Sequence, residues 1–164
     1  IRDFCLSRGL GDVYKRQKEM MPDAFIGVDV IVGTRGETEL YFEDAYRFIE
    51  GLEVTQLHVF SYSERPGTQA LKIDHVVSPE EKHRRSQRLL ALSDEKTKAF
   101  YARHIGKEAI VLAEKSKAGM PMHGFTDNYI RVELEHDDAL DNKLVRVKLG
   151  DFNEDGTALK GTII

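Results

Sequence analysis

The sequence predicts an α/β part followed by a small all-β part, and three features lead to this fold class. A strand, helix, strand order comes first, a long charged helix follows, and short strands separated by turn residues fill the chain from Lys107 onward. The chain has 164 residues, of which 41% are hydrophobic and 32% charged. This composition is that of a globular protein with room for one domain or two small ones.

An apolar run rich in β-branched residues, at 28–32, predicts a strand of a sheet that is covered on both faces. Thr38 can cap the next helix, which Gly51 ends. The apolar residues of this helix recur at helical spacing: Phe42, Ala45, Tyr46 and Ile49. Residues 55–60 return to strand composition, so the helix suits a right-handed crossover between two parallel strands.

Ligands of parallel α/β sheets and barrels lie beyond the carboxyl ends of the strands. The loops at 33–37 and 61–68 are therefore expected on one rim, where they form the candidate site.

The motif Ser78-Pro79-Glu80-Glu81 has the spacing of a capping box and predicts a helix that runs toward His104. A break near Ser93-Asp94 would split this helix in two. It is strongly basic, and pairs such as Glu81–Arg85 and Asp94–Lys98 are available along it. We interpret it as a solvated linker, residues 76–104, and assign no site to it.

From Lys107 the sequence predicts strands at 109–114, 129–134 and 144–149, with turn residues between them. Apolar and polar residues alternate at 130–134 and again at 144–149. This spacing is typical of a small antiparallel barrel.

The charge balance and the single cysteine limit the possible functions. The net charge is −4, and from Gly106 onward 8 Lys and Arg stand against 11 Asp and Glu, so any RNA-binding surface must be local. Cys5 alone cannot form a disulfide framework or a cysteine-ligated metal site, and the histidines lack metal-ligand spacing. We assign no catalytic and no metal-binding residue. Without an apolar stretch of roughly 18 residues, a cytoplasmic protein is the default expectation.

The first residues of the chain indicate a sequencing artefact. Ser7 to Gln17 reads SRGLGDVYKRQ, which matches the in-frame translation of a sequencing-library adapter. We therefore interpret residues 1–17 as foreign and expect the native protein to enter near Lys18, inside a longer reading frame.

Three segments resemble the radical S-adenosylmethionine methylthiotransferases. The first, VDVIVGTRGETE at 28–39, resembles the strand and loop that help to hold the cofactor, which implies Gly33, Gly36, Glu37 and Thr38 as cofactor-binding residues. Thr34-Arg35 replaces the Phe-Pro common in the family. The alternative is an ordinary βα turn, although the missing Gly-Lys-Ser/Thr ending disfavours a nucleotide P-loop.

The second segment, HVFSYSERPGTQA at 58–70, is similar to a Tyr-Ser-x-Arg-x-Gly-Thr signature in the tRNA branch of the family. Its Arg65 presents a planar fork to a phosphate or carboxylate, and Pro66-Gly67 fixes the turn beside it. A surface turn with a solvated arginine is the alternative.

The third segment, at 104–114 and 124–134, resembles the appended RNA-binding β-barrel called the TRAM domain. The resemblance implies phosphate contacts and base stacking, with Phe125 as a second candidate for stacking. The RNA-binding residues implied are Tyr129, Arg131, Lys143, Arg146 and Lys148.

The resemblance covers nearly everything from Lys18 to Ile164. It implies the end of a partial radical SAM barrel at 18–75, the linker at 76–104 and a TRAM domain of OB-like fold at 105–164. The parent enzyme would add a methylthio group to N6-threonylcarbamoyladenosine beside the anticodon of tRNA, with isopentenyladenosine as the runner-up substrate. Its partner would be tRNA, not DNA or a membrane.

The parent's cofactors would be S-adenosyl-L-methionine and two 4Fe-4S clusters, whose cysteines are expected before Lys18. We therefore expect this chain alone to be inactive. Two other classes stay open: a free-standing RNA-binding module from Ser78 onward, and a small α/β nucleotide-binding protein.

Overall fold

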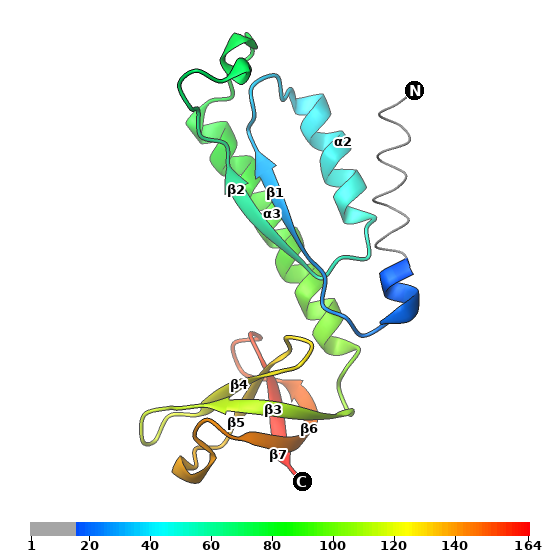
Figure 1. Cartoon of the computed structure of the whole chain (residues 1–164), viewed down its shortest axis with the longest axis vertical. Coiled ribbons are helices and arrows are strands. Elements are labelled where there is room, and N and C mark those ends of the chain that lie inside the picture. The colour runs from blue at the N-terminus through cyan, green and yellow to red at the C-terminus, as the bar shows by residue number, and fades with distance from the viewer. Residues whose placement is uncertain (1–15) are drawn as a thin grey trace. The chain divides into compact units, whose positions relative to one another are not determined.

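The computed structural model describes residues 16–164, which form two compact units (Figure 1). The α/β unit spans Ile26–His104, and the barrel unit contains Ile105–Ile164 together with the described residues before Ile26. Residues 1–15, with Cys5, lie outside the described residues, so their interpretation as an artefact stays a prediction. The predicted domain boundaries likewise stay a prediction.

The α/β unit contains a two-stranded parallel sheet, as the strand, helix, strand order predicts. The two strands pair from Gly27 opposite Gln56 to Val32 opposite Ser61. Its elements are β1 (Gly27–Val32), α2 (Glu39–Glu50), β2 (Gln56–Ser61), the 3-10 helix η1 (Gln69–Lys72) and α3 (Pro79–Ala102).

Both long helices pack on the same face of this sheet. Phe42 of α2 and Leu89 and Leu92 of α3 join strand residues in one buried cluster. On the opposite face Ile31 and Phe60, which are register partners, are exposed. The expectation of a sheet covered on both faces is therefore wrong for the described residues, because α2 and α3 share one side.

The helix ends follow the predicted capping residues, whereas the predicted break does not occur. The hydroxyls of Thr38 and Ser78 accept hydrogen bonds from Tyr41 N and Glu81 N, at 3.3 and 3.2 Å. Helix α3 continues through Ser93, whose hydroxyl bonds to the backbone N and O of Leu57 in β2 at 2.9 and 3.2 Å. Ser93 thus joins α3 to the sheet. Ala45, expected on the apolar face of α2, is exposed.

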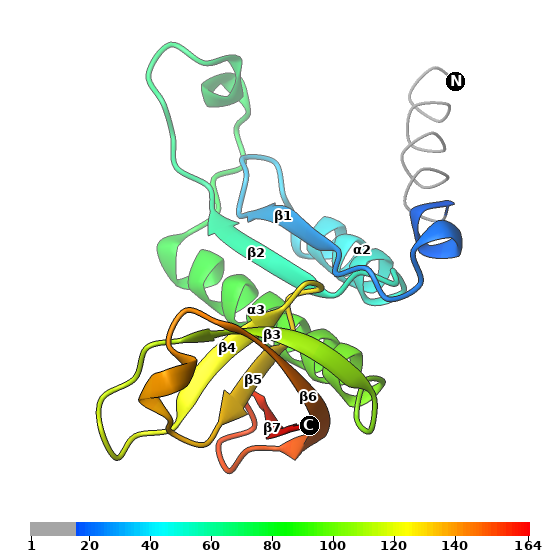
Figure 2. The same cartoon turned by 60° about the horizontal axis from the view of Figure 1, so that its bottom comes forward.

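The barrel unit contains a closed five-stranded barrel in the order β3-β4-β5-β7-β6 (Figure 2). The strands are β3 (Glu108–Glu114), β4 (Met122–Thr126), β5 (Arg131–Leu134), β6 (Leu144–Phe152) and β7 (Leu159–Ile163), with the 3-10 helix η2 (Asp138–Leu140) before β6. Strands β5 and β7 pair in parallel, so the prediction of an entirely antiparallel barrel is wrong at this pair.

Two of these strands, β4 and β7, escape sequence analysis because each contains a glycine. A Cβ at Gly124 would lie 2.3 Å from Leu112 O, and a Cβ at Gly161 would lie 2.6 Å from side-chain carbons of Val132 and Leu134. Both glycines permit a close approach between strands and do not mark turns.

The barrel core is formed by the inward side chains of every strand. These include Val111, Met122, Val132, Leu134, Val147, Leu149 and Leu159, each at most 2% exposed. No helix within residues 16–164 has the length and apolar character needed to cross a membrane.

Candidate functional site

Two loops lie together at the carboxyl ends of β1 and β2, as predicted. The first rim loop is defined here as residues 33–38 and the second rim loop as residues 62–76. The backbone N–H of Tyr62 donates to Val32 O at 2.9 Å, and the N–H of Gly36 donates to His75 O at 2.8 Å. The second rim loop therefore bonds to the last residue of β1 at its start and to the first rim loop near its end.

The first rim loop carries all four residues implied as cofactor-binding. Gly33 and Gly36 have positive φ angles of 79° and 85°, which glycine adopts without steric cost. The N–H of Gly33 donates to the Glu37 carboxylate at 2.7 Å, while Thr38 caps α2. The amides of Gly33 and Gly36 thus already have protein acceptors.

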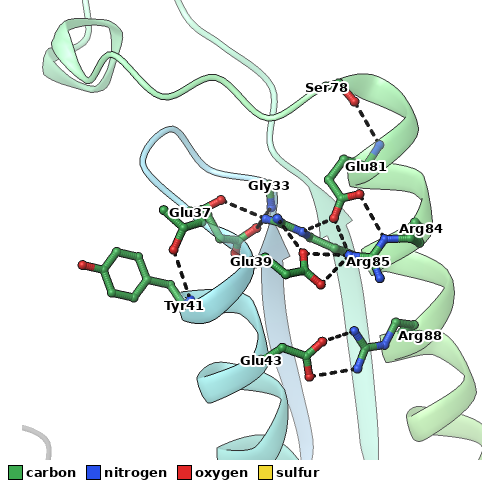
Figure 3. Close-up of polar contacts among 11 residues, drawn as sticks. Gly33, Glu37, Glu39, Tyr41, Glu43, Ser78, Glu81, Arg84, Arg85 and Arg88 are labelled. Carbon is green, nitrogen blue, oxygen red and sulfur yellow. Dashed lines mark hydrogen bonds and ion pairs between the residues drawn. The ribbon is translucent and has the colours of Figure 1, made fainter.

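Arg85 of α3 holds this loop from the side of the helix (Figure 3). Its Nη1 donates to Glu37 Oε2 at 2.7 Å and to Glu37 O at 3.0 Å, and its Nε donates to Glu81 Oε1 at 2.8 Å. The side chain is only 3% exposed, and its guanidinium lies 5.1 Å from the ring centre of Phe42. A buried charge is tolerated where it is paired and hydrogen-bonded in this way.

Further ion pairs join α2 to α3. Arg84 bonds to Glu39 and Glu81, and Arg88 bonds to Glu43 (Figure 3). The hydrogen bond from Arg84, with that from Arg85, lowers the pKa of Glu81 to about 2.

The interpretation of a solvated basic helix is wrong for Arg85, although the predicted pair with Glu81 is confirmed. Sequence analysis missed this residue as part of the site. Its signal was the spacing of Arg85 to Leu89 and Leu92, which places the arginine on the buried face of the helix.

Lys82 is a second residue that sequence analysis missed. A Cβ at Gly33 would lie 2.4 Å from Cγ of Lys82, so glycine at this position leaves room for the lysine methylenes. The ammonium of Lys82 then donates to Tyr62 O at 3.0 Å. One lysine of α3 therefore contacts both rim loops.

A cavity of about 420 Å³ opens beside the second rim loop. Its walls combine apolar, aromatic and hydroxyl side chains with one cation, from Ile31, Phe60, Ser61, Tyr62, Ser63, Arg65, Thr68 and Ala70. The Arg65 guanidinium makes no hydrogen bond or ion pair to any residue within 16–164. Its carbonyl accepts from Thr68 Oγ1 at 2.9 Å, closing a turn in which Gly67 has φ of 80°. The guanidinium is therefore available to a ligand.

The implied RNA-binding residues of the barrel lie on its outer surface. Arg146 and Lys148 alternate with buried residues of β6, and Arg146 donates to Glu108 at 2.6 Å. Lys143 is exposed just before β6. Tyr129, with φ of 60°, lies in the β4–β5 connection, where its ring centre is 5.8 Å from that of Phe25.

An outward row of side chains crosses four segments of the barrel wall. Strand register places Leu112 between Leu144 and Phe125, and Phe125 opposite Arg131. Leu112, Phe125 and Leu144 are all exposed. The structure thus adds an apolar stripe, formed by Leu112, Phe125 and Leu144, to the predicted cations. The predicted site residues as a whole form two sets, one on each unit.

Within residues 16–164, no three His, Cys, Asp or Glu side chains gather as a possible metal site. No protein family model matches the chain.

Several curated proteins are similar to it in sequence. A threonylcarbamoyladenosine tRNA methylthiotransferase of Bacillus subtilis is 33% identical over 142 residues, which are 84% of this chain and 32% of that protein. A protein of the same name from Aquifex aeolicus is 35% identical over 79% of the chain and 30% of its own length. A tRNA-2-methylthio-N(6)-dimethylallyladenosine synthase of Aliarcobacter butzleri is 34% identical over 91% of the chain and 34% of its length.

The chain spans about a third of the length of these relatives. Their match extends over most of the chain and so includes both units. The chain belongs to the MiaB/MtaB family of tRNA methylthiotransferases.

Proposed function

We propose that this chain is part of a tRNA methylthiotransferase that adds a methylthio group to N6-threonylcarbamoyladenosine beside the anticodon. The α/β unit would be the end of its radical SAM barrel, and the barrel unit would be a TRAM domain that binds tRNA. The observation that carries the proposal is the cavity with the available Arg65, next to a loop whose sequence matches the family. The names of the relatives support tRNA as the substrate class.

The chemistry of the cavity favours an adenosine that carries an anionic substituent. A threonylcarbamoyl group ends in a carboxylate, which the planar fork of Arg65 can bind through two parallel hydrogen bonds. Phe60 and Tyr62, in the same lining, offer aromatic surface to a base. We infer that Arg65 binds the substituent while these rings contact the adenine.

S-adenosyl-L-methionine and two 4Fe-4S clusters are proposed as cofactors of the parent enzyme, where the bound cofactor supplies the radical that activates the adenine carbon. Because the amides of Gly33 and Gly36 already donate to Glu37 and His75, they do not fit as donors to an adenine edge. The first rim loop, with Thr38, fits better as a fixed wall beside the cofactor.

The outer wall of the barrel supports a role in RNA binding. In the apolar stripe Phe125 offers a ring for stacking, Leu112 and Leu144 extend the apolar surface beside it, and Arg131 lies at one end of the stripe. Single-stranded nucleic acids are bound by this combination of aromatic surface and nearby cations, and OB-like barrels commonly use it. We propose that Tyr129, Lys143, Arg146 and Lys148 contact phosphate or base around this stripe.

The proposal is tested by titrating the full chain with anticodon hairpins that carry threonylcarbamoyladenosine, dimethylallyladenosine or unmodified adenosine, at several salt concentrations. We expect the threonylcarbamoyl hairpin to bind most tightly, with affinity falling as salt rises. Arg65→Met should weaken that hairpin by about 10- to 150-fold, since a hydrogen bond to a charged group contributes about 1.5–3 kcal/mol and 1.4 kcal/mol is about tenfold in affinity. Arg47→Met, which removes another exposed arginine of the α/β unit, is the control.

Equal losses for all three hairpins on Arg65→Met would contradict recognition of the carboxylate. A preference for the dimethylallyl hairpin would favour the second candidate substrate, which the apolar Ile31 and Phe60 of the cavity support. Binding that is independent of salt would contradict an RNA-binding barrel.

We also propose that the chain by itself has no methylthiotransferase activity, since Cys5 is its single cysteine. Reconstitution with iron and sulfide tests this directly. About four iron atoms per chain together with cleavage of S-adenosyl-L-methionine would overturn it. Salt-dependent tRNA binding without either result would match a role limited to RNA binding and substrate positioning.

A further inference from the structure

Arg35 lies in the first rim loop, between the glycines at positions 33 and 36. The Arg35 side chain is 19% exposed, so it lies mostly against the protein. A long cation held in this way requires partners, and its partners lie in the second rim loop.

Three hydrogen bonds run from Arg35 to that loop. Its Nε donates to Glu64 Oε1 at 2.6 Å, and its Nη1 donates to Leu71 O at 2.9 Å and to Ile73 O at 3.1 Å. The bond to Arg35 lowers the pKa of Glu64, which is therefore ionised at neutral pH. One guanidinium thus bonds to the chain on both sides of Arg65, at the residue before it and at Leu71 within η1 and Ile73 just after η1.

The contacts near Arg35 reinforce this arrangement. Gly36 N donates to His75 O, and a Cβ at Gly36 would lie 3.1 Å from Ile73 Cγ2. From the other side, Lys82 packs on Gly33 and bonds to Tyr62 O. Lys82 therefore holds the start of the segment that carries Arg65, through Tyr62. Arg35 holds the same segment at Glu64 and again at Leu71 and Ile73.

We propose that Arg35 is a positioning residue that fixes Arg65 in the wall of the cavity and couples the two rim loops. This inference rests on the proposed role of Arg65 in substrate binding. An apolar side chain at position 35 could not form these hydrogen bonds to the second rim loop. Arg35 acts through the loop and does not itself touch the substrate.

The coupling is measured by amide hydrogen exchange on the full chain. The amides of Thr68, Leu71 and Ile73 donate within the second rim loop and report its opening. Arg35→Met should speed their exchange at least about fivefold, because three hydrogen bonds from a charged group are lost. Arg35→Lys should give a smaller increase, since an ammonium cannot reproduce the planar fork. Arg47→Met should leave these amides unchanged.

A second measurement separates positioning from direct contact with RNA. Glu64→Met removes a negative charge next to the cavity, so electrostatics alone predicts tighter binding of a threonylcarbamoyladenosine hairpin. Positioning predicts the opposite sign, a loss of about threefold, because Arg35 loses its partner and the loop opens. In an Arg65→Met background Arg35→Met should then cause no further loss, as expected for a residue that acts through Arg65.

The outcomes distinguish the two levels of the proposal. Unchanged exchange of the loop amides in Arg35→Met overturns the coupling. Tighter RNA binding by Glu64→Met, or a full additional loss from Arg35→Met in the Arg65→Met background, overturns positioning in favour of direct contact. Faster exchange combined with no effect of Arg65→Met on RNA leaves the coupling standing and overturns the proposed substrate role of Arg65.

Discussion

The two units of this chain bury their apolar residues to very different extents. The barrel closes on itself, so each of its strands has two neighbours and the core residues Val111, Val132 and Leu159 are fully buried. Among residues 16–164 the α/β unit has two strands with unpaired outer edges, and it leaves Ile31 and Phe60 exposed on one face of its sheet. A closed barrel has no free edge to protect, whereas a short open sheet does.

The difference shows in what holds each unit together. In the α/β unit, charged side chains of α3 reach across to α2 and to the rim loops, with Arg85 at the centre. In the barrel the ion pairs are on the outside, and apolar packing fills the interior. The candidate site therefore lies in the unit that depends most on polar contacts, and these contacts set the shape of its loops.

Replacing Arg85 should cause the largest loss in the α/β unit. Arg85→Met leaves the largely buried Glu37 carboxylate without its cation, and breaking a buried ion pair costs about 3–5 kcal/mol. Arg88→Met breaks a partly exposed pair and should cost only about 0–1 kcal/mol. Urea unfolding, followed by hydrogen exchange of β2 and β5 amides, measures both. Equal loss of protection in β5 would show that the two units unfold as one.

Replacing one core leucine in each unit compares how strongly the barrel and the α/β unit depend on apolar packing. Leu134→Ala in the barrel and Leu89→Ala in the α/β unit each remove a side chain that is 2% exposed, at a cost of about 2–5 kcal/mol. We expect the cost of Leu134→Ala to be near the upper end of this range, because the strands of a closed barrel cannot move in to fill the cavity that the substitution creates. Differential scanning calorimetry compares the two variants, and a larger loss for Leu89→Ala would contradict this expectation.

Gly33 in the first rim loop and Gly67 in the second allow a matched comparison of two glycine-to-alanine substitutions. Both have φ near 80°, so an alanine costs about 1–2 kcal/mol at either position. At Gly33 the new Cβ would also lie 2.4 Å from Lys82 Cγ, whereas at Gly67 nothing lies within 4 Å. Gly33→Ala should therefore cost about 1–3 kcal/mol more than Gly67→Ala in chemical denaturation. Equal costs would show that Lys82 moves aside freely.

Acid should lower the stability of the α/β unit through Glu81. We expect this effect to be smaller than those of the arginine, leucine and glycine substitutions above. The folded-state pKa of Glu81 is about 2, below the value of about 4.3 for a free glutamate. Its contribution is present above about pH 4 and is lost as the pH falls toward 2. The melting temperature of the α/β unit, followed by circular dichroism, should fall over this range and should fall less in Glu81→Gln. An unchanged profile in that variant would assign the acid sensitivity to other carboxylates.

Local signals predicted the fold where the structure depends on neighbours in sequence. Thr38 and Ser78 cap their helices, and the alternation at 144–149 forms most of β6, because capping and alternation are properties of a few consecutive residues. Strands β4 and β7 escaped prediction because Gly124 and Gly161 serve packing between distant strands. Glycine spacing alone does not separate this role from a turn.

The sequence predicted where the two rim loops lie, but it did not predict the side-chain contacts that hold them. The rule for parallel sheets located both rim loops, and the predicted turn at Arg65 formed. Arg35 and Lys82, which also hold the loops, could not be identified, because their partners lie far away in the sequence. Arg85 was recognisable only from its spacing to Leu89 and Leu92. Whether a lysine or arginine is solvated or buried is decided by tertiary packing.

The parallel pairing of β5 with β7 has a consequence for synthesis on the ribosome. Strand β7 contributes Leu159–Ile163 and pairs with both β5 and β6, so it is the element that closes the barrel. While these residues are still in the exit tunnel, β5 and β6 each present an unsatisfied edge to other nascent chains. Emergence of β7 from the exit tunnel, and not synthesis of the earlier strands, therefore sets the moment at which the edges of β5 and β6 are protected from association.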